Sequence, residues 1–196
     1  MHRTVQECFD AHDGRLVDKW QHYLPIYERY FAKFVGTACR VLEIGVGHGG
    51  SLQLWKAYFG HKAQIFGLDI DIQAAQYEES QITIFIGDQK RPPHLSLLDI
   101  VIDDGSHLIA DQHASLYALW PHVRDGGVYL IEDCHEGYPE PLHKQGNCTS
   151  ISYYPSVMVY EKGPVLVPER IIAGHPSREL NIHEREAYAQ HLHPDL

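Results

Sequence analysis

The sequence predicts an α/β fold in which a mostly parallel, doubly wound sheet is followed by an antiparallel C-terminal hairpin. From Arg40 onward, short apolar runs alternate with helical stretches, and this order is typical of parallel βαβ units. Acidic and glycine-rich motifs follow the apolar runs, at the strand ends where such sheets bind ligands. We expect residues 1–196 to form one domain with one site, because this length is too short for two ordinary catalytic domains.

The composition favours a cytoplasmic protein that acts on a small molecule. Hydrophobic residues make up 44% and charged residues 21%, without an apolar run that could span a bilayer and without a signal-peptide pattern. The formal net charge is -10 and the 16 Lys and Arg residues are scattered, which argues against nucleic acid as a substrate. We therefore expect neither a membrane nor a nucleic acid as a partner.

The N-terminal segment, residues 1–36, is predicted to be a helical segment or lid. Aromatic and apolar residues recur there at steps of three or four, and Pro25 is well placed to start a helix over about 25–35. Three aromatic residues of the segment are assigned to core packing: Trp20, Tyr27 and Phe31. Exposed aromatics in this segment would fit a contact between copies of the chain, so a homo-oligomer is left open.

The core sheet is predicted over residues 37–165. Helices are expected from Ser51, from about Ile72 and near Ala110 to Leu119. The five parallel strands are expected in RVLEIGV, QIFGLDI, ITIFIGD, LLDIVIDD and VYLIED, the last entered through the turn Asp125-Gly126-Gly127. SISYY and SVMVYEK are predicted to close the sheet as an antiparallel edge hairpin. The tail, residues 166–196, gives a weak helical signal from about Pro168.

A glycine-rich loop, EIGVGHGGS, follows the first predicted strand. Glycines such as Gly45 and Gly47 let the backbone turn tightly and approach a ligand, and Ser51 is predicted to cap the next helix. Glu43 stands two residues before the first glycine, whereas the dinucleotide fingerprint opens its turn with glycine. The loop is therefore predicted to bind a cofactor through Glu43, Gly45, Gly47 and Ser51.

The next two strands end in further candidate cofactor ligands. Asp69 lies about 20 residues beyond the glycine loop, where a carboxylate can accept hydrogen bonds from both hydroxyls of a ribose. Asp71 is assigned to the N-cap of the following helix. Asp88 and Gln89 end the third strand, where Asp88 could accept a hydrogen bond from the exocyclic amine of an adenine, although a Gly-Asp pair alone is as typical of a turn.

The fourth and fifth strands end in a concentration of acidic residues. Four carboxylates and an imidazole are expected to converge there: Asp103, Asp104, Glu132, Asp133 and His107. Clustered carboxylates raise one another's pKa unless a cation neutralises them, and oxygen ligands suit Mg²⁺, with Mn²⁺ or Ca²⁺ as substitutes. The alternative is that the acids cap helices separately. His135, close by in the sequence, could line an acceptor pocket or face solvent.

These motifs, in this order, resemble metal-dependent O-methyltransferases of the macrolide and rhamnosyl sugar type, a family similar to the cephalosporin hydroxylase/methyltransferase proteins. The resemblance extends from about Asp18 to Lys162, and its motifs are DKWQHYLPIYERYF, VLEIGVGHGGSLQLW, GLDID, GDQ, VIDDGSH and LIEDCHEGY. It implies a Rossmann-like class I methyltransferase fold and S-adenosylmethionine (SAM) as the cofactor.

The resemblance also implies roles for individual residues. Mg²⁺ would be held by Asp104, Glu132 and Asp133, and His107 would be the base that takes the proton of the acceptor hydroxyl. Asp104 is counted among the cofactor contacts as well. Lys19 and Tyr23 would lie in the stretch that closes over the methionine end of SAM, where a cation and a hydroxyl could hold its carboxylate.

The function implied is methyl transfer to a hydroxyl of a small sugar-like or polyol acceptor from natural-product biosynthesis. A vicinal diol is favoured because two adjacent hydroxyls can chelate Mg²⁺ together. Larger members of the family carry an additional N-terminal domain, so the acceptor pocket is expected to be built differently here. Two alternatives stay open: an NAD-type oxidoreductase, which has no need of the clustered carboxylates, and a catalytically silent module that binds SAM or metal.

Overall fold

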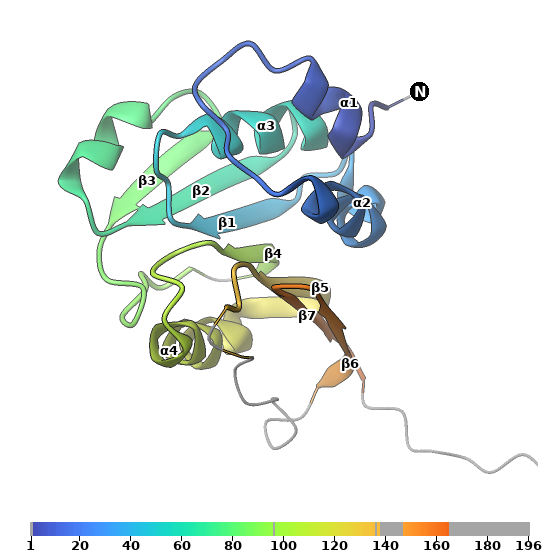
Figure 1. The fold of residues 1–196 in the computed structure, drawn as a ribbon, viewed down its shortest axis with the longest axis vertical. Coiled ribbons are helices and arrows are strands. Elements are labelled where there is room, and N and C mark those ends of the chain that lie inside the picture. The colour runs from blue at the N-terminus through green and yellow to red at the C-terminus, as the bar shows by residue number, and fades with distance from the viewer. Residues whose placement is uncertain (1, 96, 136, 138–146, 165–196) are drawn as a thin grey trace, which may run out of the picture. The chain divides into compact units, whose positions relative to one another are not determined.

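The computed structural model describes residues 2–95, 97–135, 137 and 147–164, so the predicted C-terminal tail lies outside the described residues. Seven strands form one sheet in the order β3-β2-β1-β4-β5-β7-β6 (Figure 1). The strands are β1 (Arg40–Ile44), β2 (Gln64–Asp69), β3 (Ile82–Ile86), β4 (Leu98–Asp103), β5 (Val123–Ile131), β6 (Cys148–Tyr154) and β7 (Val157–Lys162). The first five pair in parallel, and the β6–β7 hairpin joins β5 in antiparallel pairing, which confirms the predicted fold class.

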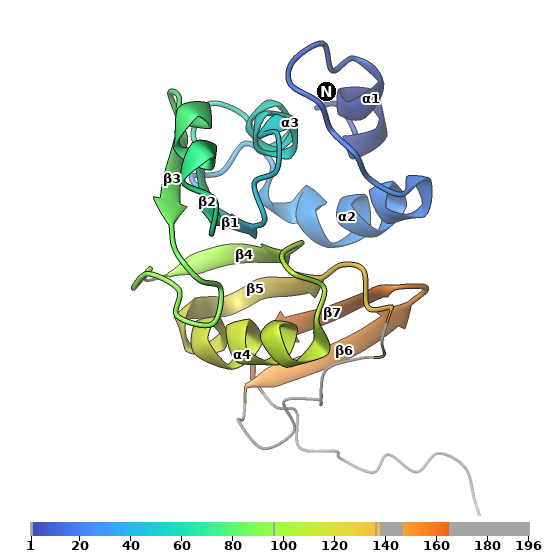
Figure 2. The same cartoon turned by 60° about the vertical axis from the view of Figure 1, so that its left-hand side comes forward.

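Helices cover both faces of the sheet. On one face lie α1 (Val5–Asp10), α2 (Leu24–Phe31) and α3 (Gly50–Phe59), and on the other lies α4 (Ile109–Leu119) (Figure 2). Consecutive β1 residues point to opposite faces: Val41 packs in the core beside α2 and α3, whereas Leu42 packs in the core beside α4. Burial on both faces explains why the central strands read as continuous apolar runs.

The N-terminal region differs from the expectation in one element. The helix predicted over about 25–35 is present as α2 followed by a 3-10 turn at Ala32–Phe34, but α1 was not predicted. Its start carries a capping box, in which Thr4 Oγ1 accepts from the Glu7 amide and the Glu7 carboxylate accepts from the Thr4 amide. That pattern is visible in the sequence and could have identified the helix.

Two connections around the sheet also differ from the expectation. The segment Ile72–Tyr77 is a 3-10 helix, begun by Asp71, whose carboxylate accepts from the Gln73 amide as predicted for an N-cap. β5 begins at Val123, before the predicted turn, and the irregularity in its pairing with β4 falls between Leu98 and Ile100. Gly126, with φ 81°, therefore lies inside the strand.

Within the part of the chain that the structure describes, no helix has both the length and the apolar character that crossing a membrane requires.

Candidate active site

A pocket of about 480 Å³ lies at the carboxyl ends of β1, β2 and β4. The strand order reverses between β1 and β4, and this switch point is where open α/β sheets bind ligands. Eight of the predicted cofactor residues line the pocket: Lys19, Gly45, Gly47, Ser51, Asp69, Asp88, Gln89 and Asp104. Neither Glu43 nor Tyr23 is among the described residues that line it.

The glycine loop forms one wall of this pocket and approaches a neighbouring strand end closely. Gly45 has φ +85°, and a β-carbon there would overlap the backbone carbonyl oxygen of Asp104. Oδ2 of Asp69 accepts from the amides of Val46 (2.8 Å) and Gly47 (3.3 Å). Asp69, the predicted ribose ligand, therefore also fixes the loop to the end of β2.

The predicted cap role of Ser51 is wrong. The N-cap of α3 is Gly49, at φ 75°, and the Ser51 hydroxyl instead donates to Oε2 of Glu43 over 2.7 Å. The indole of Trp55 donates to the same oxygen over 3.2 Å. Glu43 is fully buried beneath the loop, and burial raises its pKa. Glu43 thus lies below the pocket, where it accepts hydrogen bonds from two side chains of α3 and fixes the start of that helix.

Asp88 and Gln89 lie at the edge of the pocket as predicted, with different local roles. Oδ1 of Asp88 accepts from the amide of Lys90 over 2.9 Å. Gln89 accepts from the Ser106 amide over 2.9 Å and donates to Oδ1 of Asp103 over 3.3 Å. Gln89 therefore links the loop after β4 to the strand itself.

Asp103 does not join the other acids, which corrects the expectation that four carboxylates converge. Its side chain is fully buried, and Oδ2 accepts from the hydroxyls of Ser115 on α4 and Tyr129 on β5. Burial raises the pKa of Asp103 to about 6. The alternation of side chains along β4 accounts for the difference, because Asp103 and Asp104 point to opposite faces.

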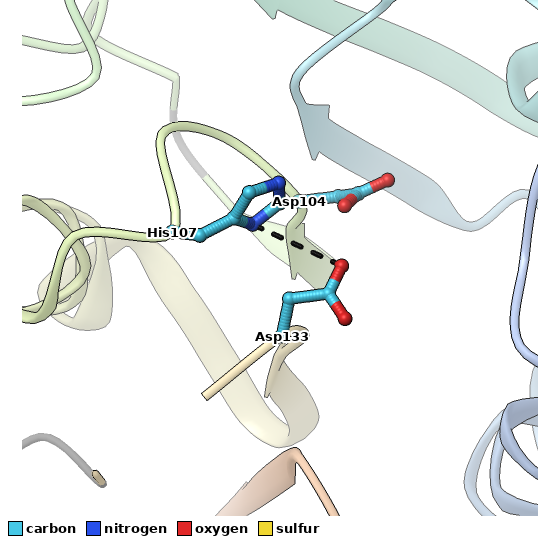
Figure 3. A group of neighbouring side chains, drawn as sticks. All are labelled: Asp104, His107 and Asp133. Atoms are coloured by element: carbon cyan, nitrogen blue, oxygen red, sulfur yellow. Dashed lines mark ion pairs between the residues drawn. The ribbon is translucent and has the colours of Figure 1, made fainter. Parts of the chain in front are cut away.

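Three of the predicted residues do converge: Asp104, His107 and Asp133 (Figure 3). Each offers a ligand atom, and these atoms lie within 4.8 Å of one another. Nδ1 of His107 is 3.9 Å from Oδ2 of Asp133. His107 and Asp133 have φ 61° and 51°, and these uncommon conformations at the two strand ends are typical of functional sites.

The donor set of this cluster fits a divalent cation. Nδ1 of His107 is inaccessible to solvent and has no hydrogen-bond partner among the described residues, although a buried polar atom normally has one. It faces two carboxylates, and oxygen ligands of this kind suit Mg²⁺ or Mn²⁺. A water or hydroxyl held by a cation between these carboxylates would supply the missing partner.

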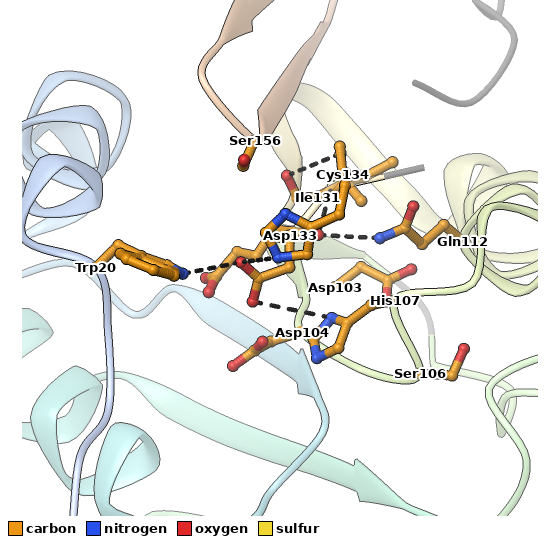
Figure 4. Close-up of polar contacts among 12 residues, drawn as sticks. Trp20, Asp103, Asp104, Ser106, His107, Gln112, Ile131, Asp133, Cys134 and Ser156 are labelled. Atoms are coloured by element: carbon orange, nitrogen blue, oxygen red, sulfur yellow. Dashed lines mark hydrogen bonds and ion pairs between the residues drawn. The ribbon is translucent and has the colours of Figure 1, made fainter. Parts of the chain in front are cut away.

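Three neighbouring side chains orient the carboxylate of Asp133. Its Oδ1 accepts hydrogen bonds from the Tyr23 hydroxyl (2.7 Å) and from the Trp20 indole (3.1 Å, Figure 4), and Nε2 of His135 lies 3.3 Å away, at ion-pair distance when that imidazole is protonated. The expectation that Trp20 packs in the core is wrong, since it is 58% exposed. Tyr23, predicted near the cofactor carboxylate, instead contacts Asp133, and burial raises its pKa.

Glu132 lies deeper than the three converging residues and is not among them. Its Oε1 accepts from the Tyr27 hydroxyl over 2.7 Å, and its Oε2 accepts from Nζ of Lys19 over 2.9 Å. Burial raises the pKa of Glu132 despite the ammonium. Tyr27 is buried as predicted, but its hydroxyl contact was not foreseen, because helical spacing shows only that the ring is internal. The role of Glu132 as a metal ligand stays a prediction.

Lys19 connects the pocket to the acids. Its ammonium donates to Asp104 (2.6 Å), Glu132 (2.9 Å) and Glu43 (3.2 Å). Burial alone would lower the pKa of Lys19, but the surrounding carboxylates, above all Glu132, raise it well above its usual value. An ammonium has three N–H donors, and all three are used here. Its predicted contact with a cofactor carboxylate stays a prediction.

The fold is that of class I Rossmann-like methyltransferases. No protein-family model matches the chain. In sequence the chain is similar to demethylmacrocin O-methyltransferase of Streptomyces fradiae, with 43% identity over 63% of this chain and 35% of the relative. It is also similar to mycinamicin VI 2''-O-methyltransferase of Micromonospora griseorubida, with 42% identity over 59% of this chain and 32% of the relative.

The solved structures of MycE methyltransferase from the mycinamycin pathway are similar to this chain as well. One, in complex with Mg and SAH, has a TM-score of 0.70 and 29% identity over 84% of this chain and 55% of that chain. Another, in complex with Mg, SAH and mycinamycin VI, has a TM-score of 0.72 and 28% identity over 96% of this chain and 60% of that chain. The predicted resemblance is confirmed, and the chain spans about a third of the length of the two curated relatives.

Proposed function

We propose that this protein is a SAM-dependent and metal-dependent O-methyltransferase that acts on a hydroxyl of a small, sugar-like acceptor. The observation that carries the proposal is the position of Asp104, which lines the 480 Å³ pocket and also belongs to the cluster with His107 and Asp133. His107 lines the pocket too, so a cofactor in the pocket and an acceptor at the cluster would meet at these two residues. The names of the relatives and the Mg and SAH in the MycE structures support the same chemistry.

The pocket offers suitable groups for the nucleoside part of SAM. Asp69 would accept a hydrogen bond from the ribose hydroxyls at Oδ1, which has acceptor capacity left beside the Asp71 amide, whereas Oδ2 already accepts from the two loop amides. Asp88 would accept from the adenine amine. Gly45 and Gly47 keep the backbone close enough to contact the ligand. These assignments follow the ordinary placement of a nucleoside in this fold.

The acceptor would bind beside Asp104, His107 and Asp133, with Glu132 as the further predicted metal ligand. A bound divalent metal lowers the pKa of a hydroxyl that it coordinates. His107 would take the hydroxyl proton, and because its side chain is 40% exposed the proton could pass on to solvent. The acceptor oxygen then bonds to the methyl carbon as the carbon–sulfur bond breaks and the electron pair returns to sulfur.

The protein contributes chiefly by positioning. Methyl transfer from a sulfonium needs no covalent intermediate, so the rate depends on holding the oxygen in line with the methyl group. Trp20, Tyr23 and His135 restrict Asp133, and Lys19 restricts Asp104. We favour a vicinal diol as acceptor because neighbouring hydroxyls can share one metal ion.

The proposal is tested with SAM labelled in its methyl group and a panel of methyl glycosides and linear polyols, in Mg²⁺ and in EDTA. We expect label to enter a vicinal diol in Mg²⁺ and not in EDTA. His107→Ala should bind SAM normally and lose at least about 100-fold in turnover, as is typical of a general base. His61→Ala, at an exposed turn, is the matched control. Undiminished turnover in EDTA, or in His107→Ala, would contradict the mechanism.

A further inference from the structure

We propose that Lys19 is an internal competitor of the metal, a positioning residue that sets the affinity of the site by occupying two of the carboxylates that the metal would use. This inference rests on the proposed function, because it concerns the same metal site. It goes beyond that function by assigning to Lys19 a part in metal binding in place of its predicted contact with a cofactor carboxylate.

The geometry places the ammonium among the acids rather than in the open pocket. The Lys19 side chain is 2% exposed, and its Nζ contacts oxygens from the ends of three neighbouring strands: Glu43 of β1, Asp104 after β4 and Glu132 after β5. Two of these three, Asp104 and Glu132, are predicted metal ligands. The shortest contact, 2.6 Å, is to Asp104, which also belongs to the cluster with His107 and Asp133.

Charge explains why such a lysine would lower metal affinity. A buried carboxylate without a counter-charge is costly, so some cation must accompany Glu43 and Glu132 in the folded protein. Lys19 meets that need without a metal. A divalent cation that binds Asp104 and Glu132 must then displace the ammonium or share the carboxylates with it, and like charges at such distances repel strongly in a medium of low dielectric constant.

The same contacts connect the metal site to the cofactor pocket. Lys19 ends a short segment in which Leu16, Val17 and Asp18 also line the pocket. The preceding residue, Arg15, is held by Glu79 over 2.9 Å. If metal binding displaced the ammonium, the segment of residues 16–19 would move with it and change the shape of the pocket wall. The ion pair of Arg15 fixes the start of this segment.

The test is calorimetric titration of the full chain with Mn²⁺ alone. We expect Lys19→Met to bind Mn²⁺ at least tenfold more tightly than the wild type, because the competing cation is gone. Lys19→Arg keeps the charge and should stay within about threefold of the wild type. Lys62→Met removes the same charge from an exposed turn and should leave the affinity within about twofold. A merely structural role for Lys19 would instead weaken binding in Lys19→Met.

If circular dichroism shows that Lys19→Met does not fold, the comparison moves to a background that has lost one buried carboxylate. Glu43→Gln combined with Lys19→Met should bind Mn²⁺ at least tenfold more tightly than Glu43→Gln alone. Equal or weaker binding by the lysine variants overturns the inference while leaving the metal site intact. Equally tight binding by Lys19→Arg and Lys19→Met also overturns it, since charge would not be the cause. Failure of every form, wild type included, to bind Mn²⁺ overturns the metal site itself.

Discussion

The hydroxyl of Tyr23 donates a hydrogen bond to Oδ1 of Asp133 over 2.7 Å, although 110 residues separate them in the chain. Tyr23 ends the short 3-10 turn before α2, and Asp133 follows β5. The N-terminal segment thus takes a direct part in the site, through a side chain that touches a predicted metal ligand. Asp133 in turn adopts φ 51°, so its orientation depends on such external contacts.

We predict that Tyr23→Phe weakens Mn²⁺ binding about tenfold, because the loss of one hydrogen bond to a charged group costs about 1.5 kcal/mol. Calorimetric titration measures the change. The matched control is Tyr30→Phe, in which the lost hydroxyl contacts Tyr154 over 2.9 Å, and it should leave Mn²⁺ affinity unchanged. Equal effects of the two substitutions would show that Tyr23 acts only through stability.

Gly45→Ala should lower the free energy of unfolding more than Gly60→Ala does. Both glycines have φ near +85°, so each substitution carries backbone strain of about 1 to 3 kcal/mol. A β-carbon at Gly45 also overlaps the Asp104 carbonyl oxygen, whereas nothing lies within 4 Å at Gly60. Urea denaturation should show an excess loss of at least about 1 kcal/mol for Gly45→Ala, a typical cost of overpacking. Equal losses would mean that the loop and the end of β4 separate easily.

Glu132→Gln should keep SAM affinity within about twofold and abolish Mg²⁺-dependent turnover, since the amide removes the ligand charge without changing the shape of the side chain. Calorimetry and methyl transfer measure the two effects. The reciprocal variant Asp69→Ala should weaken SAM binding and leave Mn²⁺ binding intact. Turnover in Glu132→Gln at the wild-type rate would remove Glu132 from the metal site.

Asp103 should make stability fall as the pH rises through the mildly acidic range. Burial raises its pKa from 3.8 to about 6, so between these values the unfolded chain releases the proton while the folded chain retains it. The free energy of unfolding should therefore decline by about 3 kcal/mol from this group, at about 1.4 kcal/mol per pH unit, and level off above pH 6. In urea denaturation at pH 4 and at pH 6.5, Asp103→Asn should show a correspondingly smaller decline, and an unchanged decline would contradict this assignment.

The sheet was predictable because each strand is marked by residues that are close together in the sequence. β1 to β5 are short apolar runs between glycine and acidic motifs, and their order along the chain implies parallel pairing. The pocket was predictable for the same reason, since strand ends in such a sheet meet at one edge. Asp69, Asp88, Gln89 and Asp104 all line it.

The sequence shows which residues lie at the strand ends but not which way each side chain turns. Asp103 and Asp104 are adjacent, yet one contacts α4 and the other the pocket, and only the face assignment of β4 separates them. Lys19 and Trp20 were recognisable as members of a motif, but their partners Glu132 and Asp133 lie more than 110 residues away. Such contacts depend on tertiary placement, which spacing along one segment does not encode.

The central claim is that the pocket at the strand ends binds SAM, and calorimetric titration with SAM and with NAD tests it most directly. We predict that SAM binds with one site per chain, that Asp69→Ala weakens this binding at least tenfold, and that NAD gives no heat of binding. Binding of NAD in place of SAM, or of neither ligand, would contradict the account of the glycine loop and of the function built on it.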